Sequence, residues 1–256
     1  MPERLREIVF THSGSDMSTS DIEVRDAKKV YYKDRIEIPV LHGLNLSIPA
    51  GQFVALMGPS GSGKSTLLHL VGGLDTPTGG SIRVGDAQLE QMSERQRTAW
   101  RSRHVGFIFQ MYHLVPVLTA AQNVELPLLL FKMPANERKE RVQTALTIVG
   151  LDDRMDHRPN QLSGGQEQRV AIARAIVTDP DVILADEPTG DLDAKTSEEI
   201  LALVGLLNSE FKKTILMVTH DPRAAGHAAR IVHLEKGLLE REEFNPARAP
   251  NEATAV

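Results

Sequence analysis

The sequence contains no cysteine. A disulfide framework, a thiolate nucleophile and a zinc–thiolate site are therefore excluded. Long hydrophobic runs are also missing. The most apolar stretches, VELPLLLF and VILA, fall far short of the roughly 18 consecutive apolar residues that a membrane span needs. We therefore expect any role at a membrane to depend on a partner protein.

An excess of basic charge is absent as well. The 256 residues carry a formal net charge of -5 at pH 7. Because a nucleic-acid-binding surface needs a basic excess, we expect no nucleic-acid partner. The N-terminus lacks the apolar core of about 7–15 residues that a signal peptide requires.

We expect one large domain with a flexible segment at each end. Residues 1–20 are polar and aperiodic, which predicts a disordered extension, and Met17 is a candidate for the true start. Residues 241–256 are predicted to be a disordered tail. The domain itself would then span residues 21–240, with a helical subdomain at about 111–162.

Short apolar strands alternate with helices along this domain. The predicted strands are 52–58, 104–109, 181–186, 214–219 and 229–235. Apolar strands that are separated by helices predict a mainly parallel sheet with both faces covered. We therefore expect an α/β fold, preceded by an antiparallel β element at residues 22–50.

The segment GPSGSGKST matches the phosphate-loop pattern G-x-x-x-x-G-K-[ST] and lies between a predicted strand and a predicted helix. In such a loop, glycines let backbone N–H groups approach phosphate oxygens, the lysine reaches the β- and γ-phosphates, and the next hydroxyl ligates Mg²⁺. A purely structural glycine-rich turn is the alternative. The expected phosphate-binding residues are Gly58, Ser60, Gly61, Ser62, Gly63, Lys64, Ser65 and Thr66, with Ser65 also a metal ligand.

Two acidic residues end the predicted strand VILADE. Because side chains alternate along a strand, Asp186 and Glu187 are expected to point to opposite sides. We assign Asp186 to Mg²⁺, through water, and Glu187 to the attacking water as general base or orienting group. The alternative is that two acids merely end a strand.

Two more polar residues follow predicted strands. His220 follows TILMVT and Gln110 follows VGFIF, which places both at the carboxyl edge where α/β sheets bind ligands. Each taken alone is more often structural. If their strands are neighbours, both would reach the γ-phosphate or the water on the metal.

A second glycine turn, in LSGGQEQRVAIARAI (residues 162–176), runs into an amphipathic helix but has no lysine of its own. With the features above, the chain now has a Walker A loop, a Q-loop at Gln110, an LSGGQ signature, a Walker B segment, a D-loop around Asp193 and an H-loop at His220. In this order, from about residue 22 to 240, they closely resemble the ATP-binding subunits of ABC transporters.

The resemblance implies a P-loop NTPase of the ABC type that hydrolyses ATP with Mg²⁺. Two subunits of that family bind head to tail, so that each signature loop completes the ATP site of its partner. The resemblance therefore implies a homodimer, and it explains the missing second lysine, which the partner supplies. The residues implied in this shared contact are Ser163, Gly164, Gly165, Gln166 and Asp193.

The family also stacks adenine on an aromatic residue ahead of the P-loop. This sequence offers Tyr31 and Tyr32 there, and the spacing favours Tyr31. The alternative is that either tyrosine only packs within its strand.

The segments ADEPTGDLD, GGLDTPTGG and VLHGLNLSIPAG resemble the branch of LolD-type lipoprotein-release and MacB-type macrolide-export ATPases. That branch implies a permease partner with few spans and a large extracytoplasmic domain, and a peripheral position on the cytoplasmic face of the inner membrane. Residues 110–131 would receive the partner, with Tyr112, His113 and Leu114 near the contact. Packing inside the helical subdomain is the other reading of these three side chains.

Two further functions share these motifs. One is a soluble ABC protein that acts on ribosomes or DNA. The acidic net charge disfavours it, and so does the segment between Lys64 and Ser163, which has the length expected within a single domain. An FtsE-like ATPase that regulates cell-wall enzymes through a membrane partner stays open as the alternative function.

Overall fold

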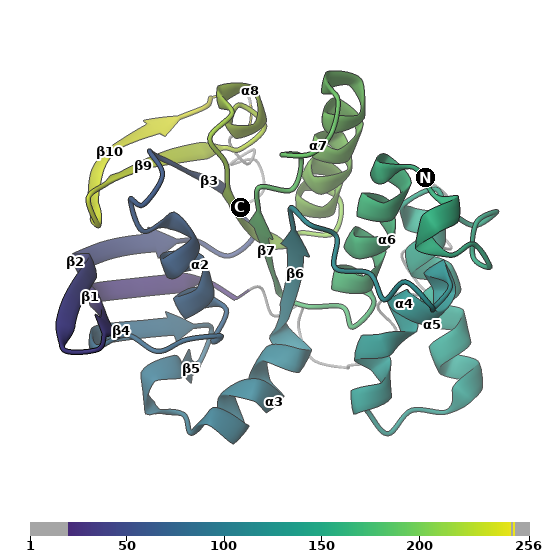
Figure 1. The fold of residues 1–256 in the computed structure, drawn as a ribbon, viewed down its shortest axis with the longest axis horizontal. Coiled ribbons are helices and arrows are strands. Elements are labelled where there is room, and N and C mark those ends of the chain that lie inside the picture. The colour runs from purple at the N-terminus through teal and green to yellow at the C-terminus, as the bar shows by residue number, and fades with distance from the viewer. Residues whose placement is uncertain (1–19, 247, 249–256) are drawn as a thin grey trace, which may run out of the picture. The chain divides into compact units, whose positions relative to one another are not determined.

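The computed structural model describes residues 20–246 and 248, which form two compact units (Figure 1). The P-loop unit comprises residues 20–99, 204–246 and 248, and the signature unit comprises residues 100–203. The predicted N-terminal extension, apart from its last residue, and Met17 lie outside the described residues.

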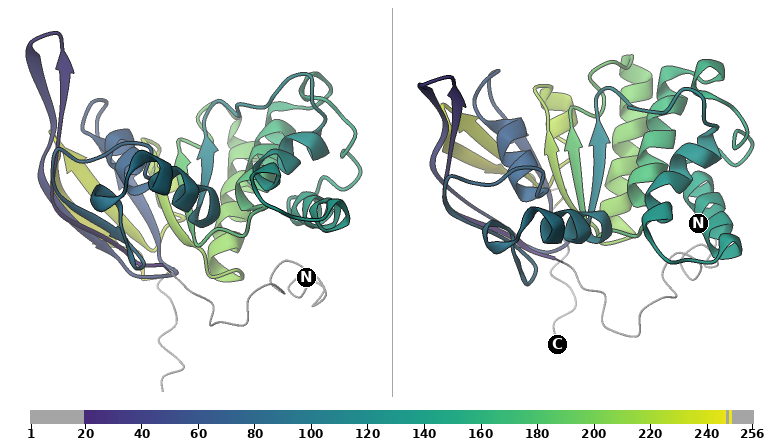
Figure 2. Two further views of the ribbon diagram at one scale, coloured as in Figure 1. Left: turned by 90° about the horizontal axis from the view of Figure 1, so that it is seen from below. Right: turned by 60° about the horizontal axis from the view of Figure 1, so that its bottom comes forward.

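The P-loop unit contains an antiparallel sheet with strand order β2-β1-β4-β5. Its strands are β1 (Ile22–Lys33), β2 (Ile36–Ile48), β4 (Gly79–Val84) and β5 (Ala87–Gln88). Ile22 pairs with Ile48 on one side and with Val84 on the other, and all three side chains are buried. Figure 2 shows the dark purple β1–β2 hairpin extending beyond the other strands of this unit.

The same unit carries the strands β3 (Phe53–Met57), β8 (Thr214–Val218), β9 (Arg230–Glu235) and β10 (Leu238–Phe244). β3 pairs in parallel with β8 and β9, while β10 pairs antiparallel with β9. β8 is buried along its whole length, as expected for a strand covered on both faces. β10 continues to Phe244, so the chain is still a strand where the tail was expected to begin.

Short helices complete the P-loop unit. They are α2 (Lys64–Val71), η1 (Leu89–Gln91) and α8 (Pro222–Ala225). α2 contacts both β4 and β8, so it is covered by one strand of each sheet. α3 (Glu94–His104) and α7 (Ala194–Ser209) each cross the division between the two units.

The signature unit pairs two parallel strands, β6 (Val105–Phe109) and β7 (Val182–Asp186). Its helices are α4 (Ala120–Glu125), η2 (Leu126–Leu130), α5 (Ala135–Ile148), η3 (Pro159–Gln161) and α6 (Gly164–Ile176). α6 packs on β6, and α4, α5 and α6 contact one another. Within residues 20–246 and 248, no helix has the length and apolar character that crossing a bilayer requires.

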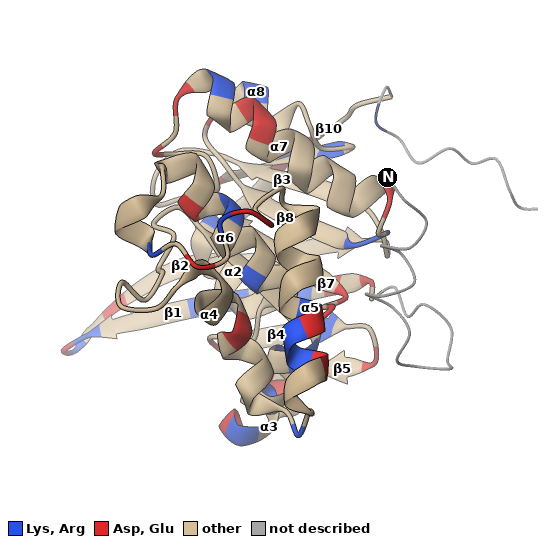
Figure 3. Cartoon of the chain, turned by 90° about the vertical axis from the view of Figure 1, so that its right-hand side faces the viewer, with Lys and Arg blue, Asp and Glu red and all other residues tan. Residues whose placement is uncertain are grey.

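Helix α5 illustrates how the sequence pattern fixes a buried face. Its first turns carry both acidic and basic residues (Figure 3), and Arg141 and Glu137 form an ion pair of 3.1 Å one turn apart. Farther along, Val142, Ala145 and Leu146 are buried. Their spacing follows the helical period, so they form one buried face of the helix.

The expected α/β class is confirmed, with a mainly parallel set of core strands, an antiparallel N-terminal sheet and a helical part. Two features lay outside the expectation. β4 and β5 extend the antiparallel sheet after α2, and β10 adds an antiparallel edge strand to the core. β5 is short and β10 is largely exposed, so neither has the apolar run that identified the other strands.

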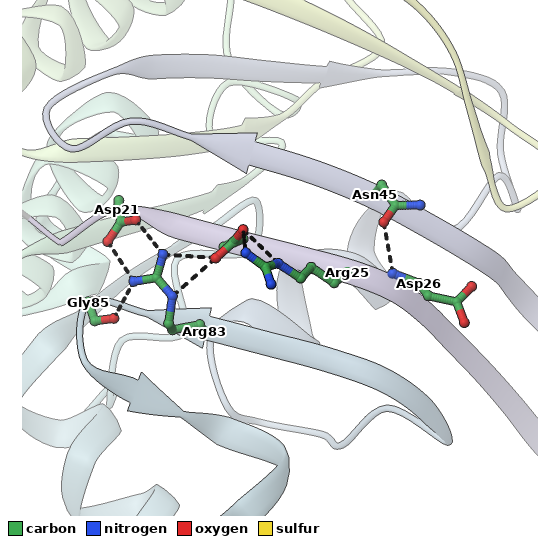
Figure 4. A network of polar contacts seen from close by, with 7 residues as sticks. Asp21, Arg25, Asp26, Asn45, Arg83 and Gly85 are labelled. Carbon is green, nitrogen blue, oxygen red and sulfur yellow. Dashed lines mark hydrogen bonds and ion pairs between the residues drawn. The ribbon is translucent and has the colours of Figure 1, made fainter.

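A charged network ties β1 to β4 in the antiparallel sheet (Figure 4). The Arg83 guanidinium donates to both carboxylate oxygens of Asp21, at 2.7 and 3.0 Å, and to Glu23 Oε2 at 2.9 Å. It also donates to the carbonyl oxygen of Gly85, at 2.6 Å. Hydrogen bonds from Arg83 lower the pKa of Asp21, and those from Arg25 and Arg83 lower the pKa of Glu23.

This network predicts that the stability of the fold decreases in acid. A carboxyl group whose pKa is lowered on folding stabilises the fold above its unfolded pKa and loses that effect as the pH falls through the folded pKa. The ordinary pKa values are 3.8 for Asp21 and 4.5 for Glu23, so the stabilising effect begins to decline at about pH 5. Arg83→Met is therefore expected to lower the melting temperature at pH 7 and to lower it much less at about pH 3.

Thermal unfolding at both pH values measures this difference, with Arg95→Met, at an exposed position on α3, as the matched control. The control is expected to melt like the unaltered protein. An Arg83→Met effect of equal size at both pH values would contradict the electrostatic origin.

Candidate nucleotide site

The P-loop connects β3 to α2 through glycines that no other residue can replace without strain. Gly58, Gly61 and Gly63 have φ angles of 148°, 78° and 99°. A Cβ on Gly58 would lie 2.1 Å from the carbonyl oxygen of Leu234, whereas a Cβ on Gly61 would meet no atom of the described residues within 4 Å. The loop is thus held closely on one side and open around Gly61.

Helix α2 begins at Lys64 with no side chain capping its first turn, because the N-cap residue is Gly63. The N–H groups of a helix's first turn have no partner within the helix and are oriented toward an anion. Lys64 Nζ donates to the carbonyl oxygens of Gly58 and Pro59, at 2.8 and 2.9 Å, so the loop wraps around the ammonium group.

Ser62 provides a test of whether this loop fits a phosphate chain. Its side chain is 2% exposed, and Oγ has no hydrogen-bond partner among the described residues. Since buried hydroxyls are normally hydrogen-bonded, an unpartnered one in this loop indicates a place for a ligand oxygen or water. The uncapped helix start, the lysine and Ser62 all fit the phosphates of a nucleotide.

The predicted metal ligands are a hydroxyl, an amide and a carboxylate, from Ser65, Gln110 and Asp186. Across residues 20–246 and 248, no three His, Asp or Glu side chains gather as a metal-binding group. Mg²⁺ at a nucleotide needs no such group, because it keeps several waters and takes phosphate oxygens with one or two protein ligands. The donor chemistry of these three residues therefore fits Mg²⁺ bound with a nucleotide.

Tyr31 lies beside the end of the P-loop. Its hydroxyl donates to Asp75 Oδ2 at 2.9 Å, and its side chain also hydrogen-bonds to Thr66. Burial raises the pKa of Tyr31, and the bond to Asp75 adds to this rise. Tyr32 is 66% exposed, and its hydroxyl donates to Glu37 Oε1 at 3.4 Å. The position next to Thr66 supports Tyr31 as the adenine-stacking residue.

His220 lies two residues beyond β8, in the P-loop unit, and its side chain is exposed. The next residue, Asp221, caps α8 by accepting from the N–H of Arg223 at 2.9 Å. Hydrogen bonds from Arg223 lower the pKa of Asp221. The turn after β8 is therefore fixed by its own cap, which leaves His220 at the edge of the sheet.

In the signature unit, β7 ends at Asp186, and Glu187 has a left-handed backbone with φ 47°. The strand therefore stops before Glu187, and the alternation of side chains along a pleated strand does not extend to this residue. A left-handed glutamate is strained, and strained backbone of this kind concentrates at functional sites. The turn sets the direction of Glu187.

Gln110 directly follows β6. In the parallel pairing of β6 with β7, Phe109 lies opposite Asp186. This pairing brings Gln110 and Glu187 to the same edge of the two strands. Gln110 Nε2 donates to Asp191 Oδ1 at 3.1 Å, and a Cβ on Gly190 would lie 2.9 Å from the Gln110 amide. A glycine at position 190 thus makes room for the glutamine.

The signature turn is built as a helix cap. Ser163 Oγ accepts from the N–H of Gln166, at 3.4 Å, and the Gln166 side chain accepts from the N–H of Ser163 at 3.0 Å. This reciprocal pair fixes the start of α6. A Cβ on Gly164 would lie 2.9 Å from Tyr112 Oη, so Tyr112 packs against the signature turn.

Asp193 has a structural task that the sequence pattern did not reveal. Its carboxylate accepts from the N–H groups of Lys195 and Thr196, both at 3.0 Å, at the start of α7. The Thr196 hydroxyl donates to it at 2.6 Å, and these bonds lower the pKa of Asp193. A Cβ on Gly165 would lie 2.4 Å from Thr196 Cγ2. The D-loop cap thus lies directly against the signature glycines.

Gln168, which sequence reasoning missed, connects three parts of the signature unit. It is fully buried on α6, and its Nε2 donates to the carbonyl oxygens of Phe109, at 3.2 Å, and Pro188, at 2.5 Å. The first carbonyl precedes Gln110 and the second follows Glu187. Only a long buried amide on this face of α6 reaches both, and the amphipathic pattern of the helix gave no signal of it.

We expect Gln168→Leu to lower the free energy of unfolding by about 2 kcal/mol, because one buried and one partly buried carbonyl group lose their donor. Chemical denaturation of purified protein measures this change. Gln143→Leu, the same replacement at an exposed position on α5, is the control and is expected to have little effect. Equal stability of the two variants would contradict the bridging role.

Arg174, near the end of α6, holds the segment after Gln110. Its guanidinium donates to the carbonyl oxygens of Tyr112 and His113, both at 2.7 Å. Burial lowers the pKa of Arg174. Helix α6 therefore fixes the Q-loop segment at two places, through Gln168 and Arg174.

Comparison with known proteins is consistent with these observations. Residues 41–190 match the family described as ABC transporter. The lipoprotein-releasing system ATP-binding protein LolD of Legionella pneumophila (strain Lens) is 46% identical over 215 residues, which cover 84% of this chain and 95% of that protein. The macrolide export ATP-binding/permease protein MacB of Syntrophobacter fumaroxidans is 46% identical over 223 residues, which cover 86% of this chain and 31% of that protein.

A solved structure shows a similar fold. It is the dimeric post-hydrolysis state of the ATP-binding cassette MJ0796 of Methanocaldococcus jannaschii, bound to ADP and Pi. The two chains have a TM-score of 0.80 and 44% sequence identity, and the match covers 87% of this chain and 98% of that chain.

Proposed function

The chain belongs to the ATP-binding proteins of the ABC transporter family, and we propose that it is the ATP-hydrolysing subunit that powers a membrane permease. One observation carries this proposal. A single chain holds a P-loop shaped for phosphates and, in its signature unit, a second glycine turn at the start of α6 that lacks a lysine.

Each residue then has a defined task during hydrolysis. Backbone N–H groups of the P-loop and Lys64 bind the phosphates, and Tyr31 stacks on adenine. Ser65 and, through water, Asp186 and Gln110 would hold Mg²⁺, which would supply positive charge at the phosphates. Glu187 orients the attacking water and accepts its proton, while His220 hydrogen-bonds to the γ-phosphate. The open space around Gly61 and the unpartnered Ser62 hydroxyl support the phosphate assignment.

We propose that the active form is a homodimer in which each signature turn completes the partner's site. Ser163, Gly164, Gly165 and Gln166 would meet the γ-phosphate, aided by the positive end of α6. Asp193 lies against this turn through Thr196 and would join the same contact. The dimeric state of the similar cassette MJ0796 supports this arrangement.

The segment expected to receive the permease exposes apolar side chains. Met111 and Val117 are 66% and 73% exposed, and Leu130, on η2, is 73% exposed. Tyr112, by contrast, packs against Gly164, and Arg174 holds the carbonyl groups of Tyr112 and His113. We propose that a helix of a membrane partner binds these apolar residues and acts on the signature turn through Tyr112.

The names of two relatives, a lipoprotein-releasing system ATP-binding protein and a macrolide export ATP-binding/permease protein, support lipoprotein release or export as the driven process. We propose a partner with few spans and a large extracytoplasmic domain, through which the chain drives release, export or force transmission. The chain would then lie at the cytoplasmic face of the inner membrane. Signalling to cell-wall enzymes through an FtsE-like partner is the alternative.

Affinity purification tests the proposal. Tagged Glu187→Gln protein is incubated with ATP and detergent-solubilised native membranes, and the captured proteins are identified by mass spectrometry. We expect a membrane protein with few spans and a large outer domain. Capture of a partner linked to cell-wall hydrolases would favour the signalling alternative. Ribosomal or DNA-bound proteins without any membrane protein would overturn both.

A further inference from the structure

The turn between β9 and β10 meets the P-loop through backbone contacts. The N–H of Gly237 donates to the carbonyl oxygen of Ser62 at 3.1 Å, and the carbonyl oxygen of Gly237 accepts from the N–H of His42 at 3.2 Å. Both bonds connect segments far apart in the sequence. Gly237 therefore joins the P-loop to β2.

The conformation of the turn directs these groups. Lys236 and Gly237 have φ angles of 47° and 76°, and Glu235 pairs with Leu238 across them. Two consecutive residues with positive φ are the hallmark of a two-residue hairpin turn that matches the twist of its strands. The hairpin thus holds the Gly237 N–H in a fixed direction, toward Ser62.

The turn and the P-loop both approach the backbone of Val40 so closely that each has a glycine there. A Cβ on Gly237 would lie 2.2 Å from the carbonyl oxygen of Val40 and 2.7 Å from the His42 ring. A Cβ on Gly63 would lie 3.2 Å from that same Val40 oxygen. The Val40 carbonyl is therefore enclosed between the hairpin turn and the last glycine of the P-loop.

A second contact comes from the strand before the turn. The carbonyl oxygen of Leu234, on β9, would be 2.1 Å from a Cβ on Gly58. The first glycine of the loop thus rests on β9, Ser62 is bonded to the turn, and Gly63 packs on β2. Three backbone segments fix the loop at its start, its middle and its end.

We propose that the β9–β10 turn, centred on Gly237, is a positioning element that keeps the P-loop in the shape that binds the phosphates of a nucleotide. The inference rests on the proposed function of the P-loop. Gly237 does not touch the nucleotide and acts through Ser62. The Gly237 N–H holds the backbone carbonyl oxygen of Ser62 in place. The N–H groups of the loop are therefore arranged before the ligand arrives, which reduces the ordering that binding requires.

The test compares nucleotide affinity in three purified variants, with ADP as the probe so that dimer formation does not contribute. Gly237→Ala adds a Cβ that collides with Val40 and moves the turn from Ser62. Gly237→Asn adds the same Cβ but tolerates the left-handed backbone, so it isolates the collision from the strain. Gly51→Ala is the control for strain alone, since Gly51 has φ 73° and its Cβ would meet only the Lys212 carbonyl oxygen, at 3.5 Å.

In isothermal titration calorimetry, both Gly237 variants are expected to bind ADP about tenfold more weakly, because they lose one well-placed hydrogen bond. Gly51→Ala is expected to melt at a lower temperature and to keep the affinity of the unaltered protein. Folded Gly237→Ala protein with unaltered affinity would overturn the inference. Failure of the unaltered protein to bind ADP would instead overturn the proposed function.

A second measurement applies even if the Gly237 variants do not fold. Amide hydrogen exchange of the unaltered protein is followed with and without saturating ADP. We expect slower exchange at residues 236–238 with ADP, while residues 89–91 of η1 exchange at the same rate in both. Unchanged exchange at residues 236–238 would also overturn the positioning role.

Discussion

Glu187→Gln is expected to bind ATP normally and to lose at least about a hundredfold of the hydrolysis rate. The amide keeps the size of the side chain but cannot accept a proton from the attacking water. Its left-handed turn after β7 stays the same, because the change leaves the backbone untouched. The variant should therefore accumulate as an ATP-bound dimer, at about twice the monomer mass of 28.2 kDa.

Steady-state ATPase assays and sedimentation velocity with ATP measure these two properties. Glu140→Gln is the matched control, because it makes the same chemical change at an exposed position on α5. It should hydrolyse ATP at the unaltered rate. Normal turnover by Glu187→Gln would remove Glu187 from its assigned role.

Ser163→Arg is expected to abolish ATP-driven dimerisation and nearly all hydrolysis, while nucleotide binding to the monomer persists. A long cation at the signature turn would occupy the space of the partner's phosphates. The substitution also removes the cap of α6, since Ser163 Oγ accepts from the N–H of Gln166. Losing such a cap costs about 1 kcal/mol of stability.

Ser163→Ala separates the two effects, because it loses the same cap but leaves the space open. We expect Ser163→Ala to melt at a lower temperature and to dimerise with ATP, and Ser163→Arg to stay monomeric at every ATP concentration. A normal ATPase rate for folded Ser163→Arg would contradict the shared site.

The sequence predicted those parts of the molecule that depend on local chemistry. The P-loop spacing predicted the turn before α2, and buried apolar runs predicted β3, β6, β7, β8 and β9. Such runs are informative because a strand covered on both faces must be apolar throughout. The second glycine turn, at residues 162–166, was also predicted from local sequence, because Ser-Gly-Gly before an amphipathic run is typical of a helix start.

The parts that sequence did not predict depend on contacts between distant segments. Gln168 looks like any polar residue on a helix, and only the fold shows that the Phe109 and Pro188 carbonyl groups meet it. Gly237 looks like an ordinary hairpin glycine until the Ser62 contact is visible. The left-handed backbone of Glu187 was not predicted, because it belongs to the turn after β7 and not to the apolar run of the strand.

The shared site is the central claim, and engineered cysteines test it most directly. The sequence has no cysteine, so any disulfide must join the introduced pair. One tagged chain carries Ser60→Cys in the P-loop and a differently tagged chain carries Ser163→Cys in the signature turn, both with Glu187→Gln. The chains are mixed and oxidised with ATP, with ADP or without nucleotide. The shared site predicts a disulfide-linked heterodimer with ATP and little without it, because a disulfide needs the two backbones within about 7 Å. No link with ATP, or equal linking under all three conditions, would contradict it.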